Sequence, residues 1–269
     1  MNKTIITSEA PTMGEYLSKV WKHRHFVLVL AKRDLKIKYA QTLLGVAWSI
    51  VQPLVAVVVF TLFFGVLLNL ETPYPYVLFV LSGVVCWNFF NYIFSHGSTS
   101  LMNSQDLIRK LSFPKIILPI SKVLVGLVEF SFTLLLMVPV FIYHHASISW
   151  NIIFFPVVIF FVLIFSLGLS LILAASTLRF RDLHHIIPFL VNFGIWFTPV
   201  FYPVSLIPDQ YKDFIYLNPM ASLIGLARWS LFGEPVGFMA LFGVLISVMF
   251  LVIGVIYFKR VEDRISETV

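Results

Sequence analysis

Residues 152–177 read IIFFPVVIFFVLIFSLGLSLILAAST and contain no charged side chain. A helix of about 20 apolar residues, rising about 1.5 Å per residue, spans the roughly 30 Å hydrocarbon core of a bilayer. In lipid the backbone N–H and C=O groups must be satisfied internally, which favours a helix. This stretch therefore predicts a transmembrane helix.

Five further stretches meet the same test. They lie at residues 46–68, 76–94, 116–143, 186–207 and 238–258. Pro199 and Pro203 fall inside the fifth span of the chain, 186–207, and should kink it or end it early. The sequence thus predicts an all-α integral membrane protein with six transmembrane helices at 46–258, between a cytoplasmic N-terminal segment (1–45) and a cytoplasmic tail (259–269).

The placement of Lys and Arg predicts the orientation. Of the 19 Lys and Arg residues, all but Lys212 and Arg228 fall on one side of the six predicted spans. The connections at 69–75 and 144–151, on the other side, contain no Lys or Arg. By the positive-inside rule the basic side is cytoplasmic, so both termini are expected there.

The composition excludes several classes of protein. Hydrophobic residues make up 59% of the chain and charged residues 12%, which argues against a water-soluble domain. A single cysteine, Cys86, excludes an intramolecular disulfide and a CxxC metal site. The net charge of +6 follows the predicted membrane sidedness, so no nucleic-acid partner is expected. Residues 1–25 are polar and basic, and no cleavable signal peptide is predicted there.

Three predicted elements do not span. The first is an amphipathic helix at about 12–30, opened by a capping box of Thr12 and Glu15 and expected to lie in the cytoplasmic headgroup plane. A plain juxtamembrane anchor is the alternative. The second is a short helix in the long cytoplasmic connection 97–122, ending before Pro114. A solvated loop is the alternative there. The third is an outer connection at 208–235, broken at Asn218-Pro219 and read as a re-entrant helical hairpin, with a surface lid as the alternative.

The short cytoplasmic helix carries the predicted partner-binding residues. Its apolar side chains recur at helical spacing and its charged ones lie among them, as in a docking helix for a soluble partner. The candidates are Ser104, Asp106, Leu107, Ile108, Arg109, Lys110 and Leu111.

The sequence lacks the motifs of an ATPase and of a metal site. It contains no GxxxxGK[ST] phosphate-binding loop, so ATP and Mg²⁺ are expected on another subunit. Each adjacent His pair, at 144–145 and at 184–185, diverges by about 100° on a helix and predicts no metal site. Ser170 and Gly168 favour close helix packing over a nucleophilic site. Glu129, midway along the third span, is either a hydrogen-bonded packing residue or a residue with a role in translocation or between spans.

Several motifs resemble one family along nearly the whole chain. They are RDLK (33–36), Tyr39, LGVAW (44–48), QPL (52–54), FPKIILP (113–119), RFRDL (179–183), TPVFYP (198–203) and LNPM (217–220). Together they resemble the ABC-2 type polysaccharide export permeases, with the O-antigen transport permeases the most similar.

The resemblance implies a function and an assembly. Such permeases form homodimers of six-span subunits in the bacterial inner membrane and bind two copies of an ABC ATP-binding subunit. They export undecaprenyl-diphosphate-linked polysaccharide to the periplasm. In them the short cytoplasmic helix, here about 103–111, docks on the ATPase, and the outer hairpin, here 208–235 with Asn218 and Pro219, is a gate.

Two further sets of residues fit that expectation. Arg33, Lys36 and Lys38 lie where a lipid diphosphate would approach the first span from the cytoplasm, although basic residues there also satisfy the positive-inside rule. Aromatic faces suit sugar rings, so the path candidates are Phe60, Phe64, Phe197, Phe201 and Tyr202. Export of teichoic acid, capsule or a drug-like lipid is the alternative, and a membrane acyltransferase or protease is a third.

Overall fold

The computed structural model describes residues 12–40, 42–180 and 182–266, and within these ranges it contains helices and no strand. The predicted all-α class is therefore confirmed. The first eleven residues of the predicted N-terminal segment, Arg181 of the RFRDL motif and tail residues 267–269 lie outside the described part of the chain.

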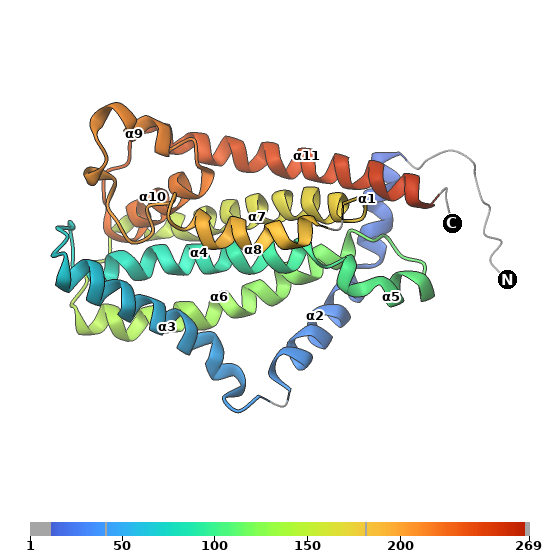
Figure 1. Ribbon diagram of the computed structural model, residues 1–269, viewed down its shortest axis with the longest axis horizontal. Helices are drawn as coiled ribbons and strands as arrows, with labels where there is room; N and C mark the ends of the chain where they lie inside the picture. Colours follow the sequence, from blue (N-terminus) through green and yellow to red (C-terminus); the bar gives the residue numbers. More distant parts are fainter. Residues whose placement is uncertain (1–11, 41, 181, 267–269) are drawn as a thin grey trace.

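Five helical stretches of the described chain are long and apolar enough to cross a membrane. Most of them run along the long axis of the molecule, whereas the stretch at 45–67 lies obliquely to it (Figure 1). In chain order they are η1 (Gly45–Ala47), α3 (Trp48–Phe60) and the π-helix η2 (Thr61–Leu67); α4 (Tyr76–Ser98); α6 (Ile117–Tyr143); η4 (Trp150–Phe154) with α7 (Phe155–Thr177); and η6 (Phe238–Ala240) with α11 (Leu241–Ser266). They correspond to five of the six predicted spans.

The fifth predicted span is a shorter helix followed by irregular backbone. Helix α8 (Leu183–Gly194) ends before Pro199, and turns continue to the 3-10 helix η5 (Val204–Leu206). The 12 residues of α8 rise only about 18 Å. Figure 1 shows α8 and the following turns leading from the end of α7 to the end of the molecule where α9 begins. The predicted early end is confirmed, and a sixth crossing stays a prediction.

Helix α4 forms the centre of the bundle. It packs against α3, α6, α7 and α10, and the side chains of Phe79, Cys86 and Ile93 are 0% exposed. Helix α7 packs against α11 so closely that a Cβ on Gly168 would lie 2.5 Å from the backbone nitrogen of Leu251. The prediction that Gly168 allows close helix packing is confirmed.

The N-terminal region is two helices, where the sequence predicted one. Helix α1 (Met13–Lys22) begins with the predicted capping box, in which Thr12 N–H donates to Glu15 (2.9 Å) and Glu15 N–H donates to the Thr12 hydroxyl (3.4 Å). The chain breaks at His23, and α2 (Arg24–Tyr39) continues at an angle toward the start of α3 (Figure 1). The expectation of one continuous helix over 12–30 was wrong, because the backbone turns at His23.

The other short helices lie at the two ends of the bundle. At one end, η3 (Met102–Ser104) and α5 (Gln105–Lys110) form the predicted short helix between α4 and α6. At the other, α9 (Asp209–Ile215) and α10 (Pro219–Phe232) meet at Asn218, where the sequence predicted the break. Helix α10 packs between α4, α7 and α11, whereas Tyr211, Phe214 and Leu217 on the α9 side of the hairpin are exposed. Its placement relative to a membrane stays a prediction.

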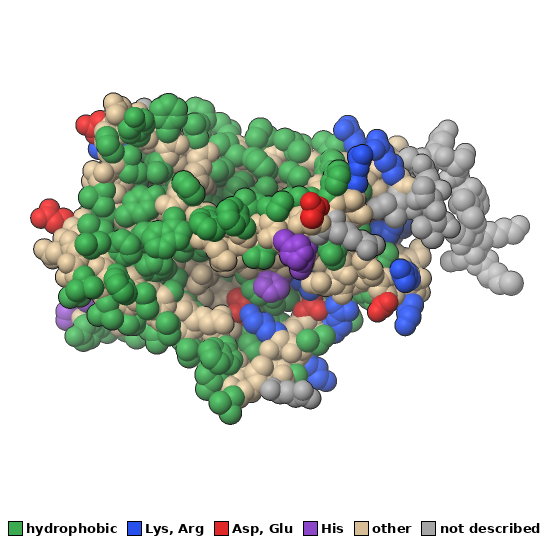
Figure 2. All heavy atoms as spheres, viewed as in Figure 1, with side chains coloured by type: hydrophobic (Ala, Val, Ile, Leu, Met, Phe, Trp, Pro, Cys, Tyr) green, Lys and Arg blue, Asp and Glu red, His purple; other side chains and the backbone are tan. Residues whose placement is uncertain are grey.

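The charges are distributed unevenly over the surface. Figure 2 shows Lys and Arg side chains at the right, where α1, α2, α5 and the end of α11 lie, and hydrophobic side chains over most of the rest of this face. The two ends of the molecule are thus chemically different, as the sequence predicted.

Candidate functional site

A cluster of charged and hydroxyl side chains lies where α2, α3 and α6 meet. Glu129 of α6 accepts hydrogen bonds from Lys38 Nζ (2.7 Å) and from the Tyr39 hydroxyl, both at the end of α2. The same hydroxyl lies 2.9 Å from Ser49 Oγ of α3. Figure 2 shows acidic, basic and histidine side chains gathered in this region. Glu129 therefore joins the end of α2 to two of the long helices.

The cluster is largely shielded from solvent. The side chain of Glu129 is 13% exposed and that of Lys38 is 36% exposed. The Lys38 ammonium also lies 4.7 Å from the ring centroid of Tyr92 on α4, a cation–π contact. Burial and the hydrogen bond to Glu129 raise the pKa of Tyr39 to about 12, so its hydroxyl remains a donor. Glu129 is thus a hydrogen-bonded interhelical residue, and a role in translocation stays a prediction.

A second ion pair connects the middle of α2 to α6. Asp34 lies 2.5 Å from Lys122 Nζ of α6 and 2.9 Å from Arg33. Burial opposes ionisation of Asp34, but the hydrogen bonds from Lys122 and Arg33 hold the pKa of its carboxyl below the ordinary value. Of the predicted headgroup residues, Arg33 and Lys38 are therefore already paired with carboxylates. Lys36 is exposed and makes no ion pair with any described residue.

The predicted partner-binding helix presents a mostly charged face. Asp106, Arg109, Lys110 and Leu111 are exposed. The others differ from the expectation of an exposed apolar surface: Ser104 is buried, and Leu107 and Ile108 pack against a buried cluster that includes Leu101, Phe113 and Ile117. They face inward because the helix is short and its one apolar side covers the end of the bundle.

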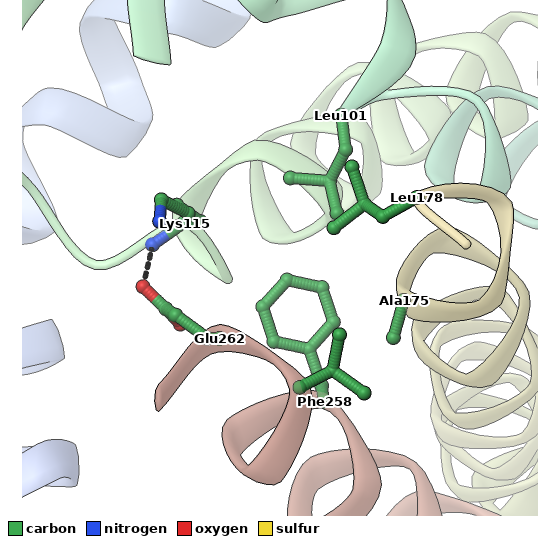
Figure 3. Close-up of a pocket in the computed structure, with 7 residues that line it drawn as sticks. Leu101, Lys115, Ala175, Leu178, Phe258 and Glu262 are labelled. Atoms are coloured by element: carbon green, nitrogen blue, oxygen red, sulfur yellow. Dashed lines mark hydrogen bonds between the residues drawn. The ribbon is translucent and has the colours of Figure 1, made fainter. Parts of the chain in front are cut away.

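A glutamate ties the segment after α5 to both ends of the described chain. Glu262 of α11 accepts hydrogen bonds from the Tyr16 hydroxyl of α1 (2.6 Å) and from the backbone N–H of Lys115 (2.6 Å). Figure 3 shows the second bond beside the packed side chains of Leu101 and Phe258. Burial and the nearby Glu262 raise the pKa of Tyr16, so this hydroxyl stays protonated. A displacement of the segment that follows α5 would therefore alter its contacts with α1 and α11.

Four of the five predicted path aromatics come together. The ring of Phe201 stacks on that of Phe60 with centroids 4.7 Å apart, and lies 4.9 Å from Phe64 and 5.4 Å from Tyr202. Phe197 is the exception, because its ring is 72% exposed and lies outside this stack. Sequence reasoning missed Trp196, whose ring lies 4.8 Å from Phe201.

The outer hairpin is fixed to the irregular segment after α8. The side chain of Asn218 caps α10 by accepting from Met220 N–H (3.0 Å), and its amide donates to Thr198 Oγ1 (2.9 Å) and to the Phe197 carbonyl (3.2 Å). Pro219 is the first residue of α10, a position that suits proline. The predicted pair thus holds the turn between α9 and α10 against the end of the fifth predicted span.

Sequence reasoning also missed the long-range partners. Asp34 and Lys122 lie 88 residues apart in the chain, and Arg228 was noted only for its sidedness. The prolines in the fifth predicted span were a signal that a hydrogen-bond donor lies nearby, because a carbonyl without its helical partner needs a donor in a membrane.

Within the described ranges, no three His, Cys, Asp or Glu side chains come close enough together to hold a metal ion.

Comparisons with known proteins extend these observations. The model of the ABC-2 type transporter family matches residues 25–232. The O-antigen export system permease protein RfbA of Myxococcus xanthus is 34% identical over 215 residues, which cover 79% of this chain and 82% of that protein. A protein of the same name from Klebsiella pneumoniae is 26% identical over 250 residues, covering 90% and 93%. The polysialic acid transport protein KpsM of Escherichia coli is 21% identical over 245 residues, covering 88% and 93%.

Proposed function

The chain belongs to the ABC-2 type transporter family, and we propose that it is the membrane permease of a polysaccharide exporter. The observation that carries this proposal is the similarity to O-antigen export permeases over most of both chains. The cargo we propose is an undecaprenyl-diphosphate-linked polysaccharide of the O-antigen type, moved from the cytoplasm to the periplasm. A capsule polysaccharide is the second candidate, and the weaker similarity to the polysialic acid transport protein KpsM supports a polysaccharide cargo in either case.

The proposed arrangement places the protein in the bacterial inner membrane with both termini in the cytoplasm. The uneven distribution of Lys and Arg supports this orientation. We propose six crossings, with α8 and the turns up to Pro203 making the fifth. The contact of Tyr16 in α1 with Glu262 near the end of α11 supports an even number, because it brings both ends of the described chain to one side.

We propose that ATP hydrolysis takes place on a separate ABC ATP-binding subunit, which also binds ATP and Mg²⁺. The exposed Asp106, Arg109, Lys110 and Leu111 offer it a docking surface. Movement there would pass through the backbone of Lys115 to Glu262, which contacts both that N–H and Tyr16.

We propose that the lipid diphosphate headgroup approaches the connection between the end of α2 at Tyr39 and the start of α3 at Trp48. Lys36 is the basic residue best suited to contact it, because Arg33 and Lys38 are held by Asp34 and Glu129. A cation near the membrane surface attracts an anionic headgroup by about 1 kcal/mol. The exposed apolar faces of α3 and α8 suit contact with lipid and with a second copy of the chain in a homodimer.

Affinity purification from native membranes tests the proposal. We expect an ABC ATP-binding protein to co-purify in an amount equal to this chain, as measured by quantitative mass spectrometry. We expect the purified chain alone to hydrolyse no ATP. Recovery of the chain without any ATP-binding partner would contradict the proposal.

A further inference from the structure

Arg228 is a buried cation in the outer half of the molecule. It lies on α10 and its side chain is 3% exposed. Within the described ranges no carboxylate lies within ion-pair distance of its guanidinium. Burying such a charge is costly, so the groups that accept its hydrogen bonds indicate its role.

The guanidinium bonds to the irregular segment that follows α8. Nη1 donates to the carbonyl of Pro199 (2.8 Å) and Nη2 to that of Val200 (2.8 Å). Nη2 also lies 3.2 Å from the carbonyl of Phe79 on α4, and the guanidinium carbon lies 3.5 Å from the centroid of the Phe79 ring. Nε lies 3.4 Å from Ser82 Oγ. The planar fork of arginine can serve several acceptors at once, which a lysine ammonium does with less fixed geometry.

The neighbouring carbonyls are satisfied in the same way. Asn218 donates to the Phe197 carbonyl (3.2 Å), and the Tyr76 hydroxyl of α4 donates to the Phe201 carbonyl (2.5 Å). The segment also lies close to α4, because a Cβ on Gly83 would be 2.6 Å from the Val200 oxygen. Side chains from α4 and the hairpin thus donate to carbonyls that the irregular backbone after α8 leaves without helical partners.

We propose that Arg228 is the positioning residue of the outer gate. It joins α10 to the segment 197–202 and thereby seats Phe201 on the rings of Phe60 and Phe64 of α3. The hairpin and this segment lie at the same end of the molecule (Figure 1), and in this proposal they close the outer end of the path as one body. That this end of the molecule is a gate rests on the proposed function, but the placement of the segment can be measured without cargo or ATP.

Thiol labelling of a cysteine in the segment tests this. Val200 is 0% exposed, so Val200→Cys in a Cys86→Ala background reports whether the segment is pinned. In native membranes treated with N-ethylmaleimide, we expect Arg228→Met to speed labelling of that cysteine about tenfold or more. The reason is that each hydrogen bond from the charged guanidinium stabilises the buried position of the segment, and the variant loses all of them. The matched control is Lys212→Met, which removes the other basic side chain of the outer connection; we expect no change.

Two further measurements separate positioning from general stability. The native Cys86 of α4 is also 0% exposed, and in Arg228→Met with Val200 retained it should stay as protected as in the parent. Arg228→Lys should give an intermediate rate at position 200, and it is the variant to read if Arg228→Met does not accumulate. Labelling at position 200 no faster than in Lys212→Met would overturn the proposal, as would equal acceleration at Cys86.

Discussion

The ion pair between Lys38 and Glu129 gives the most direct energetic prediction. We consider Glu129→Gln, which keeps an acceptor for the Tyr39 hydroxyl but removes the charge that faces Lys38 Nζ at 2.7 Å. Exposed pairs contribute about 0.2–1 kcal/mol, whereas breaking a buried pair costs about 3–5 kcal/mol. With Glu129 13% exposed and Lys38 36% exposed, the pair lies between these limits, so we expect a loss of about 2 kcal/mol in the free energy of unfolding.

A double-mutant cycle measures how much of this loss comes from the interaction between Lys38 and Glu129. The variants Lys38→Met, Glu129→Gln and the double variant would be unfolded by SDS in mixed micelles, and we expect a coupling free energy of about 1 kcal/mol. Lys36→Met is the matched control, because Lys36 lies on the same helix, exposed and without an ion pair in the described part of the chain; we expect a change below about 0.5 kcal/mol. Additive effects of the two single changes would refute the reasoning.

Three further predictions follow from other contacts. Arg109→Glu with Lys110→Glu reverses the exposed charge of α5, and should lower recovery of the ATP-binding subunit without changing membrane insertion; undiminished recovery would count against the docking assignment. Gly168→Ala should lower the free energy of unfolding by about 1–3 kcal/mol, since the added methyl meets α11 backbone. Gly14→Ala, where a Cβ meets nothing within 4 Å, should not destabilise. Because the folded-state pKa of Asp34 is lowered, its stabilising effect is present at neutral pH and lost as pH falls through that value. Asp34→Asn should therefore destabilise at pH 7, with the difference shrinking below about pH 4; a difference constant down to pH 3 would contradict this.

Local patterns predicted much of the fold. Five of the predicted spans follow from runs of about 20 apolar residues, and the structure has helices of that length at those positions. Thr12 and Glu15 predicted the cap of α1, and Pro199 predicted the early end of α8. These features are determined by residues close together in the chain, which is why local sequence patterns predict them.

Features set by distant residues could not be predicted in the same way. Nothing local marks the break at His23, where neither glycine nor proline is present. The burial of Ser104 and the partners of Glu129 depend on how helices far apart in the chain are packed. Arg228 is an intermediate case, because the broken fifth span required donors but did not identify them.

The amount of polysaccharide reaching the cell surface tests the central proposal most directly. In cells lacking this chain, we expect surface polysaccharide to disappear while its lipid-linked form accumulates inside, and we expect both changes to be reversed when the chain is restored. Surface polysaccharide that persists at normal levels without the chain, with no internal accumulation, would contradict the assignment as an export permease.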